Sequence, residues 1–259
     1  MKYSPLDHVA FANNLFETED LDPVYVGLVR LELSPGQLAA WLLSYWCFYH
    51  SGVSCKLTES HNYWDDMIQY AGMQAAPRGT ERRHFRGQKA VEAVYYLQRR
   101  YRTPLNAMED LASGDQTFQD ISQRVQQWPL FGPWIAFKVA DMLERCAKVP
   151  VDFSNCELSM YSEPTKGAVL ISQQQGWSPL VRKVCQNLGL IHIGRKAPPT
   201  YDRFVNIQEI ETILCKFKAH WNGHYPLGKD TIEVCHALKG WGPLADKMRN
   251  SLPDHVCPI

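Results

Sequence analysis

Several features that would assign this 259-residue chain to a special class are missing from its sequence. There is no run of about 20 apolar residues, which a membrane span needs, and the start lacks the apolar core of a signal peptide. None of the eight cysteines forms a C-x-x-C pair, which argues against a zinc knuckle or ribbon. We therefore expect an intracellular, cytoplasmic protein with reduced thiols packed as small apolar groups, and with no metal or cofactor.

The chain also lacks an excess of charge of either sign, because 27 Lys and Arg residues balance 27 Asp and Glu residues. Any affinity for nucleic acid must then come from local clustering of basic residues. Apolar residues make up 45% of the chain, a normal fraction for a globular protein. A chain of this length can bury a substantial core, as one large domain or as two packed subdomains.

Alternating strand patterns are scarce, whereas helix start and stop signals recur along the chain. Ser34 and Gln37 have the spacing of a capping box, and Gly52 is the expected stop of that helix. Two short apolar segments, 167–172 and 188–194, fit buried strands or helix ends equally well. We predict an all-α fold. Further helix starts are expected at Asn106, Thr117, Ser178, Asn206 and Asp230, and after Gly-Pro pairs at 132–133 and 242–243.

The stretch 128–152, WPLFGPWIAFKVADMLERCAKVPVD, has the pattern of a helical hairpin followed by a single carboxylate. Pro129 ends the preceding helix, Gly132 permits a tight turn, and Pro133 suits the first turn of the next helix. Free backbone N–H groups at such a helix start bind phosphate readily. Spacing alone favours an ordinary pair of packed helices. The carboxylate, Asp152, gives the stretch its chemical interest.

This hairpin resembles the helix–hairpin–helix DNA glycosylase superfamily, which carries L-P-G-hydrophobic-G-x-x-T-A and then an aspartate, commonly in "VD", that opens a later helix. Here WPLFGPWIA occupies the hairpin, and Asp152 follows Gly132 by twenty residues, the usual separation. The resemblance implies a single domain over 1–259 with a glycosylase-like fold of two packed helical subdomains. Its helix–hairpin–helix lies at about 118–147. It also implies that Asp152 is catalytic and that Gly132 contacts the DNA backbone.

Departures from the superfamily pattern narrow the chemistry. Trp134 stands where lysine-dependent glycosylases place their nucleophile, so we expect no Schiff-base or strand-cleaving chemistry. Leu130 replaces the first hairpin glycine, which weakens the case for phosphate binding by this loop. The four-cysteine iron–sulfur pattern of one branch is also missing. What remains is a glycosylase-like frame with one carboxylate at its active-site position.

Positive charge is concentrated in 78–102, which contains eight Lys or Arg residues and two Glu residues. We interpret the part bracketed by Gly79 and Gly87 as a loop that becomes a helix near 88. Arginine forks suit phosphate oxygens, although a solvated basic face is an alternative. The candidate phosphate- and substrate-binding residues are Arg78, Arg82, Arg83, His84, Arg86 and Lys89, and the candidate DNA-backbone residues are Arg99, Arg100 and Arg102.

The whole chain resembles one branch of the superfamily, the bacteriophage amino acid:DNA transferases, also called alpha-glutamyl/putrescinyl thymine pyrophosphorylases. The resemblance rests on DPVYVGL (22–28), YWCFYHSG (45–52) and RGTERRHFRG before the hairpin. It implies an enzyme that acts on DNA containing phosphorylated or pyrophosphorylated 5-hydroxymethyluracil. A free amine, with glycine favoured, displaces the leaving group. Such hypermodified thymidine would protect a viral genome from host restriction, and the enzyme would act in the host cytoplasm.

The resemblance also assigns roles to the candidate residues. Asp152 would orient or deprotonate the amine, because an ammonium group has no lone pair for attack, and the arginines would neutralise the departing phosphate or hold the amino acid's carboxylate. The target base must leave the stack. Candidate stacking residues are Tyr45, Tyr49, Trp128 and Trp134, each of which also fits a core position. Two alternatives stay open: a monofunctional base-excision DNA glycosylase, and a helix–hairpin–helix DNA-binding module.

Overall fold

The computed structural model describes residues 5–253 of the chain. No β-strand forms in that range, where isolated bridges join only two pairs of residues, Thr117 with Asp152 and Lys196 with Phe204. The predicted all-α fold is therefore confirmed. In chain order the helices are α1 (His8–Glu17), α2 (Pro23–Arg30), α3 (Pro35–Phe48), α4 (Ser51–Thr58), α5 (Tyr63–Gly72), η1 (Thr80–Arg82), α6 (Gly87–Tyr101), α7 (Pro104–Ala112), α8 (Phe118–Val125), α9 (Pro133–Ala147), η2 (Leu158–Met160), α10 (Ser162–Gln175), α11 (Val181–Ile191), α12 (Ile207–Trp221), α13 (Lys229–Leu238) and α14 (Pro243–Asn250), where η marks a 3₁₀ helix.

Contacts divide the described residues between two compact units. One, which we call the hairpin unit, consists of residues 27–155 and 234–251 and contains every candidate site residue named above. The other, which we call the companion unit, consists of residues 5–26, 156–233 and 252–253. Among the helices that the structure describes, none is long and apolar enough to cross a membrane.

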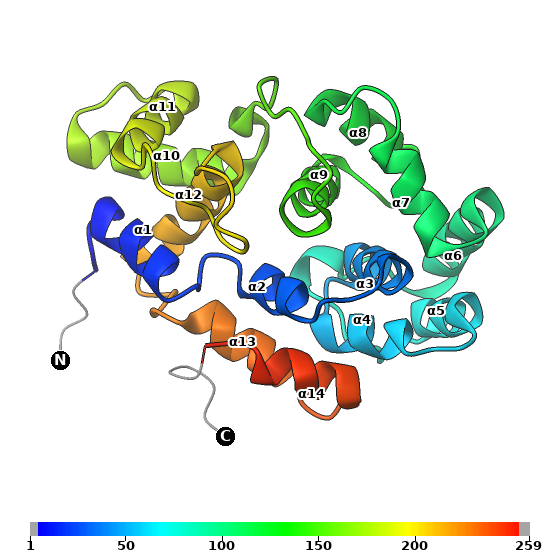
Figure 1. The fold of residues 1–259 in the computed structure, drawn as a ribbon. Coiled ribbons are helices and arrows are strands. Elements are labelled where there is room, and N and C mark those ends of the chain that lie inside the picture. The colour runs from blue at the N-terminus through cyan, green and yellow to red at the C-terminus, as the bar shows by residue number, and fades with distance from the viewer. Residues whose placement is uncertain (1–4, 254–259) are drawn as a thin grey trace. The chain divides into compact units, whose positions relative to one another are not determined.

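In the companion unit the principal packing is between α10 and α12, which lie side by side in Figure 1. Gly167 permits their close approach, since a Cβ there would lie 2.0 Å from the carbonyl oxygen of Leu214. The buried carboxylate of Asp20 accepts hydrogen bonds from the hydroxyl of Tyr225 at 2.8 Å and from the backbone N–H of Thr231 at 2.8 Å. Because a buried charge needs such partners, Asp20 is a structural group.

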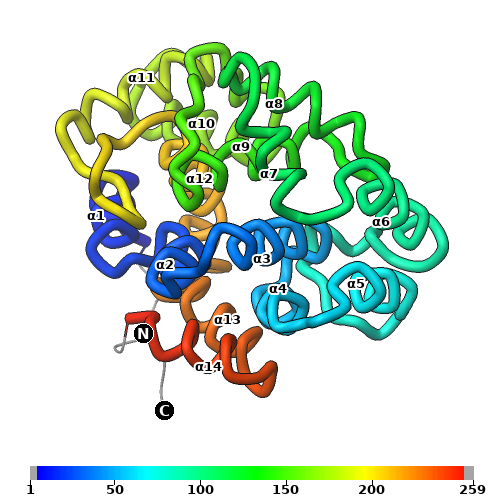
Figure 2. Tube along the Cα trace, turned by 45° about the vertical axis from the view of Figure 1, so that its right-hand side comes forward, coloured from blue at the N-terminus to red at the C-terminus, as the bar shows by residue number. Residues whose placement is uncertain are grey.

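In the hairpin unit α3 is the central helix, and ten consecutive residues from Ala39 to Phe48 are buried. Helices α4, α7 and α9 pack on it, which explains why its apolar residues cover all sides instead of one stripe. Figures 1 and 2 show α14 beside α4. The carboxylate of Glu59 accepts the backbone N–H of Leu244 at 3.1 Å near the start of α14.

The helix starts test the capping signals. The capping boxes at Ser34 and Asn206 form, and the side chain of Thr117 accepts the N–H of Asp120 at the start of α8. The predicted starts at Asn106, Ser178 and Asp230 are wrong, because α7, α11 and α13 begin earlier or later, at Pro104, Val181 and Lys229. For α7 the reason is local: Thr103 caps the helix and proline follows it, a stronger start than Asn106 provides. The segments 167–172 and 188–194 belong to α10, and to α11 and the turn after it.

The predicted helix stop at Gly52 is wrong. Helix α3 ends at Phe48, and Tyr49 adopts the left-handed conformation (φ 51°) as its C-cap. Gly52 instead lies inside α4, where a Cβ would come within 2.3 Å of the carbonyl oxygen of Ala237 and 2.4 Å of the Trp241 ring. The glycine therefore serves close packing and not helix termination.

Most of the described cysteines carry reduced thiols, as expected: Cys47, Cys55, Cys146, Cys156, Cys185 and Cys215. Burial raises the pKa of the Cys47 and Cys55 thiols to about 12, so both are inert apolar groups. The expectation is wrong for Cys235, which is disulfide-bonded, and Cys257 lies outside the described residues.

Candidate functional site

Asp152 is fixed by its backbone to the segment that precedes α8. Its N–H donates to the carbonyl oxygen of Gln116 at 2.7 Å, and its own carbonyl oxygen accepts the N–H of Phe118 at 2.8 Å. The chain therefore leaves α9 and returns to the start of α8 at Asp152. The next residue, Phe153, is buried and stacks on Phe118 with ring centroids 5.6 Å apart. Asp152 does not open a helix, which corrects that element of the superfamily pattern.

The side chain of Asp152 is exposed and has a fixed orientation. Its Oδ1 accepts the backbone N–H of Ser154 at 2.8 Å, and its Oδ2 accepts the Ser154 hydroxyl at 2.9 Å. A carboxylate oxygen can accept more than one hydrogen bond, so both oxygens keep accepting capacity for a substrate. A carboxylate held in this way can accept a proton from an amine that reaches it.

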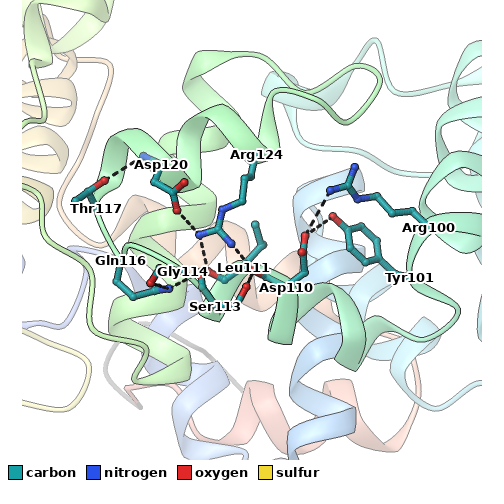
Figure 3. Close-up of polar contacts among 10 residues, drawn as sticks. All are labelled: Arg100, Tyr101, Asp110, Leu111, Ser113, Gly114, Gln116, Thr117, Asp120 and Arg124. Atoms are coloured by element: carbon teal, nitrogen blue, oxygen red, sulfur yellow. Dashed lines mark hydrogen bonds and ion pairs between the residues drawn. The ribbon is translucent and has the colours of Figure 1, made fainter.

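Asp152 pairs with Thr117 in an isolated bridge. Thr117 ends a short segment, residues 113–117, which we call the strap and which a polar network holds in place (Figure 3). The amide of Gln116 donates to the carbonyl oxygens of Ser113 at 2.8 Å and of Gly114 at 3.3 Å, which closes the strap on itself. Arg124 on α8 donates to the Asp120 carboxylate at 2.5 Å and to carbonyl oxygens at the end of α7. These bonds fix the segment on which Asp152 sits.

The same network continues toward the hairpin through Asp110 on α7. The Tyr101 hydroxyl donates to the Asp110 carboxylate at 2.8 Å, and Arg100 lies 3.8 Å from it (Figure 3). Trp128, at the base of the hairpin, donates its indole N–H to the Tyr101 oxygen at 2.9 Å. Burial and the bond to Asp110 raise the pKa of Tyr101 to about 12, so it remains a neutral donor.

The hairpin loop uses its residues differently from the sequence prediction. Pro133 does open α9, with Gly132 as N-cap. Gly132, however, has φ −99°, and a Cβ there would meet no atom within 4 Å. Leu130 holds the left-handed conformation instead, with φ 67°. The prediction that Gly132 permits the turn is therefore wrong. Its contact with the DNA backbone stays a prediction, which its exposed position at the start of a helix allows.

Arg78 is engaged by the protein backbone. Its guanidinium donates to the carbonyl oxygens of Tyr70 at 2.8 Å and Ala71 at 3.2 Å, at the end of α5, and to those of Ala76 and Phe85. Burial, with the nearby charge of Arg86, lowers its pKa. These contacts give Arg78 a structural role, in place of the phosphate contact expected from the sequence.

Arg82 is also engaged, and it is only 6% exposed. Its Nε donates to the carbonyl oxygen of Cys47 at 3.1 Å and its Nη1 to that of Leu130 at 2.7 Å. The guanidinium carbon lies 4.8 Å from the Phe85 ring centroid and 4.5 Å from that of Phe131. Burial lowers the pKa of Arg82 to about 10, so it remains protonated at neutral pH. Arg82 thus joins α3 to the hairpin loop.

The other residues of this cluster are exposed, and they flank the start of α6: Arg83, His84, Arg86 and Lys89. The side chain of Arg83 donates from Nη1 to the carbonyl oxygen of Thr80 at 3.0 Å. The expected helix near 88 is confirmed, since α6 begins at Gly87, and the segment before it is a loop apart from the short 3₁₀ helix η1. The phosphate-binding role of these four residues stays a prediction.

Arg99, Arg100 and Arg102 lie at the opposite end of α6 and are exposed. A helix of 15 residues spans about 22 Å, so this set is well separated from the cations near Gly87. Arg100 is engaged with Asp110 and with the Tyr96 hydroxyl at 3.2 Å. Their contact with the DNA backbone stays a prediction.

Burial separates the four candidate stacking residues into two pairs. Tyr45 and Trp128 are 5% and 1% exposed and belong to the core. Tyr49 and Trp134 are half-buried, and their rings meet edge to face with centroids 5.2 Å apart. Tyr49 in turn lies against Tyr45, with centroids 4.6 Å apart. Only this second pair, which neighbours the hairpin loop, has surface left for a base.

Sequence reasoning missed Ser154 and the strap 113–117. Ser154 had a usable signal, because a hydroxyl two residues after an aspartate commonly bonds to its carboxylate. The strap had none, because its contact with Asp152 joins segments about 35 residues apart in the chain.

Comparison with known proteins identifies the family. A family model described as amino acid:DNA transferase matches residues 16–224. This chain belongs to the amino acid:DNA transferase family. A glycinyltransferase of Pseudomonas phage PaMx11 is 39% identical over 273 aligned residues, which cover 94% of each chain. A putrescinyltransferase of Delftia phage PhiW-14 is 29% identical over 262 aligned residues, covering 94% of this chain and 82% of the relative.

The family and enzyme class inferred from the sequence are thereby confirmed. The protein is a transferase that acts in DNA modification, with DNA and an amino acid as its substrates. The non-enzymatic alternative, a DNA-binding module, does not account for membership of this family.

Proposed function

We propose that this transferase attaches glycine to 5-phosphomethyl- or 5-pyrophosphomethyl-deoxyuridine in DNA and displaces phosphate or pyrophosphate. The reaction would be one step in a viral thymidine hypermodification that protects the genome from host restriction. The observation that carries the choice of glycine is the similarity to a glycinyltransferase over 94% of both chains. The phosphorylated base is the substrate that the sequence resemblance implies.

In the proposed reaction the amine nitrogen attacks the methylene carbon attached to C5 of the uracil ring. The C–N bond forms as the C–O bond to phosphate breaks, and the bonding electrons leave with the phosphate. The ammonium group must lose a proton before it can attack, and Asp152 is the proposed acceptor. Its exposure and the two hydrogen bonds from Ser154 support this role, because both leave the carboxylate oriented and accessible.

The departing phosphate needs compensating positive charge. Arg83, Arg86 and Lys89 are the proposed source, since they are exposed around the start of α6. Arg78 and Arg82 are removed from this role by their bonds to backbone carbonyl oxygens. At the other end of α6, Arg99, Arg100 and Arg102 are proposed to contact the DNA backbone.

The target base must leave the helical stack to reach a protein site. Tyr49 and Trp134 are the proposed surface for the extruded base, because each is half-buried and their rings are in contact. An aromatic ring can stack on any base, so this pair would contribute affinity without sequence preference.

The test is incubation of the protein with labelled glycine and matched duplexes that contain 5-phosphomethyluracil, 5-pyrophosphomethyluracil, 5-hydroxymethyluracil or thymine at one position. We expect label in DNA only for a phosphorylated base, and the better of the two identifies the leaving group. Abasic sites without label would instead establish a monofunctional glycosylase. Labelled putrescine and glutamate in parallel reactions test the choice of amine.

A further inference from the structure

Arg82 is a buried cation whose contacts lie within the protein. Two donor nitrogens bond to backbone carbonyl oxygens, those of Cys47 at the end of α3 and Leu130 in the hairpin loop. The rings of Phe85 and Phe131 cover the guanidinium, which adds cation–π attraction. The third nitrogen, Nη2, is buried and has no hydrogen-bond partner among the described residues. A phosphate oxygen cannot reach that atom while the loop is in place.

The carbonyl oxygen that Arg82 holds belongs to the residue with the least favourable backbone conformation in the loop. Leu130 has φ 67°, a region that residues with a Cβ disfavour. It also occupies the position at which the hairpin pattern described above carries a glycine. Because leucine alone does not favour this peptide orientation, a bond from a charged donor offsets the disadvantage.

The loop is fixed from a second direction by Trp128. Its indole is buried and donates to the Tyr101 hydroxyl at 2.9 Å. Between these two attachments the chain passes through Leu130 to Gly132, the exposed N-cap of α9. Trp134, half-buried, follows in the first turn of that helix.

We propose that Arg82 is a positioning residue for DNA binding, which holds the loop at Leu130 and so presents the N-terminus of α9 to the DNA backbone. This inference rests on the proposed contact between the hairpin and DNA, and not on the identity of the base or the amine. It replaces the phosphate contact that the sequence suggested for Arg82. Arg99, which is exposed and proposed to contact the DNA backbone, is the matched comparison.

The salt dependence of plain-duplex binding separates the two roles. A lysine or arginine that contacts a phosphate contributes about 0.9 to the slope of log affinity against log salt. We expect Arg82→Gln to weaken duplex binding about tenfold with the slope unchanged, because no phosphate contact is lost. Arg99→Gln, at a proposed DNA-backbone contact, is expected to reduce the slope by about 0.9. A slope reduced equally in both variants would overturn the proposal, since Arg82 would then be a phosphate ligand.

Two further measurements keep the test decisive. Hydrogen exchange at the amides of Phe131, Gly132 and Trp134 should be faster in Arg82→Gln than in Arg99→Gln. Leu130→Gly in the Arg82→Gln background should restore part of the duplex affinity, because glycine adopts the left-handed conformation readily. Should Arg82→Gln not fold, Arg82→Lys serves in its place, since it keeps the charge but not the planar fork.

Unchanged duplex affinity and unchanged exchange in the folded Arg82 variant would overturn the positioning role. None of these readouts uses phosphorylated DNA or glycine, so they are distinguishable from failure of the proposed glycine transfer. In the transfer assay itself, Arg82→Gln should raise KM for DNA about tenfold and change kcat less than threefold. A loss confined to kcat would also contradict the proposal.

Discussion

The two ends of α8 hold their candidate functional groups in opposite ways. At its start, Asp152 is fixed through its backbone, to Gln116 and Phe118, and its side chain is exposed. After its end, the hairpin loop is fixed by the buried side chains of Arg82 and Trp128. A helix of eight residues spans about 12 Å, so these are two separate places in the hairpin unit.

The difference corresponds to what each place is proposed to do. When only backbone hydrogen bonds anchor an aspartate, its carboxylate stays available for contact with a substrate. When side chains anchor a loop, its backbone N–H groups stay available for contact with phosphate. We therefore infer that the start of α8 supplies the proton acceptor and that the loop after its end supplies contact with the DNA backbone.

The largest effect is expected from a substitution of Asp152, at the start of α8. Asp152→Asn keeps the shape of the side chain but removes its ability to accept a proton. Because general-base catalysis contributes about a hundred- to ten-thousand-fold, we expect the single-turnover transfer rate to fall by a factor in that range. Duplex affinity should change less than threefold. Glu109→Gln, at an exposed carboxylate on α7, is the control and should leave both quantities unchanged.

A smaller effect sharpens the comparison between the two basic sets on α6. Arg83→Gln with Arg86→Gln should raise KM for phosphorylated DNA about tenfold and weaken plain duplex less, because their proposed partner is the leaving phosphate. Arg99→Gln with Arg102→Gln should weaken both duplexes equally and reduce the salt slope by about 1.8. Should Arg83→Gln with Arg86→Gln weaken the binding of phosphorylated and plain duplex equally, these two arginines would contact only the DNA backbone.

The smallest effect is expected at the hairpin glycine. Gly132→Ala should change the free energy of unfolding by less than about 0.5 kcal/mol, since its φ is −99° and a Cβ would meet no atom within 4 Å. Gly242→Ala, in the second Gly-Pro opening, should cost about 1–2 kcal/mol because Gly242 has φ 105°. Urea denaturation measures both. Equal costs would show that Gly132 is conformationally required after all.

These two glycines also show the limit of sequence prediction here. The Gly-Pro pairs correctly predicted the starts of α9 and α14, because proline suits the first turn of any helix. They did not predict which residue takes the left-handed conformation, since that depends on how the loop is held. At the hairpin it is Leu130, whose carbonyl oxygen bonds to an arginine 48 residues away.

For the candidate site, too, the sequence predicted which residues to consider but not how the fold uses them. The spacing in 128–152 led to Asp152, and local charge density led to the arginines of 78–89. The division of those arginines into buried and exposed residues was not predicted, although Arg82 and Phe85 have a spacing that places them on one side of a turn. The partners that bury Arg82 come from α3 and the hairpin, which only the fold brings together.

The most direct test of the account is mass spectrometry of the nucleosides from 5-phosphomethyluracil duplex, after incubation with glycine and either wild-type protein or Asp152→Asn. The account predicts a thymidine nucleoside carrying glycine in place of phosphate with the wild type. With Asp152→Asn it predicts unreacted phosphorylated nucleoside at the same duplex occupancy. Formation of the glycine adduct at the wild-type rate by Asp152→Asn would contradict it.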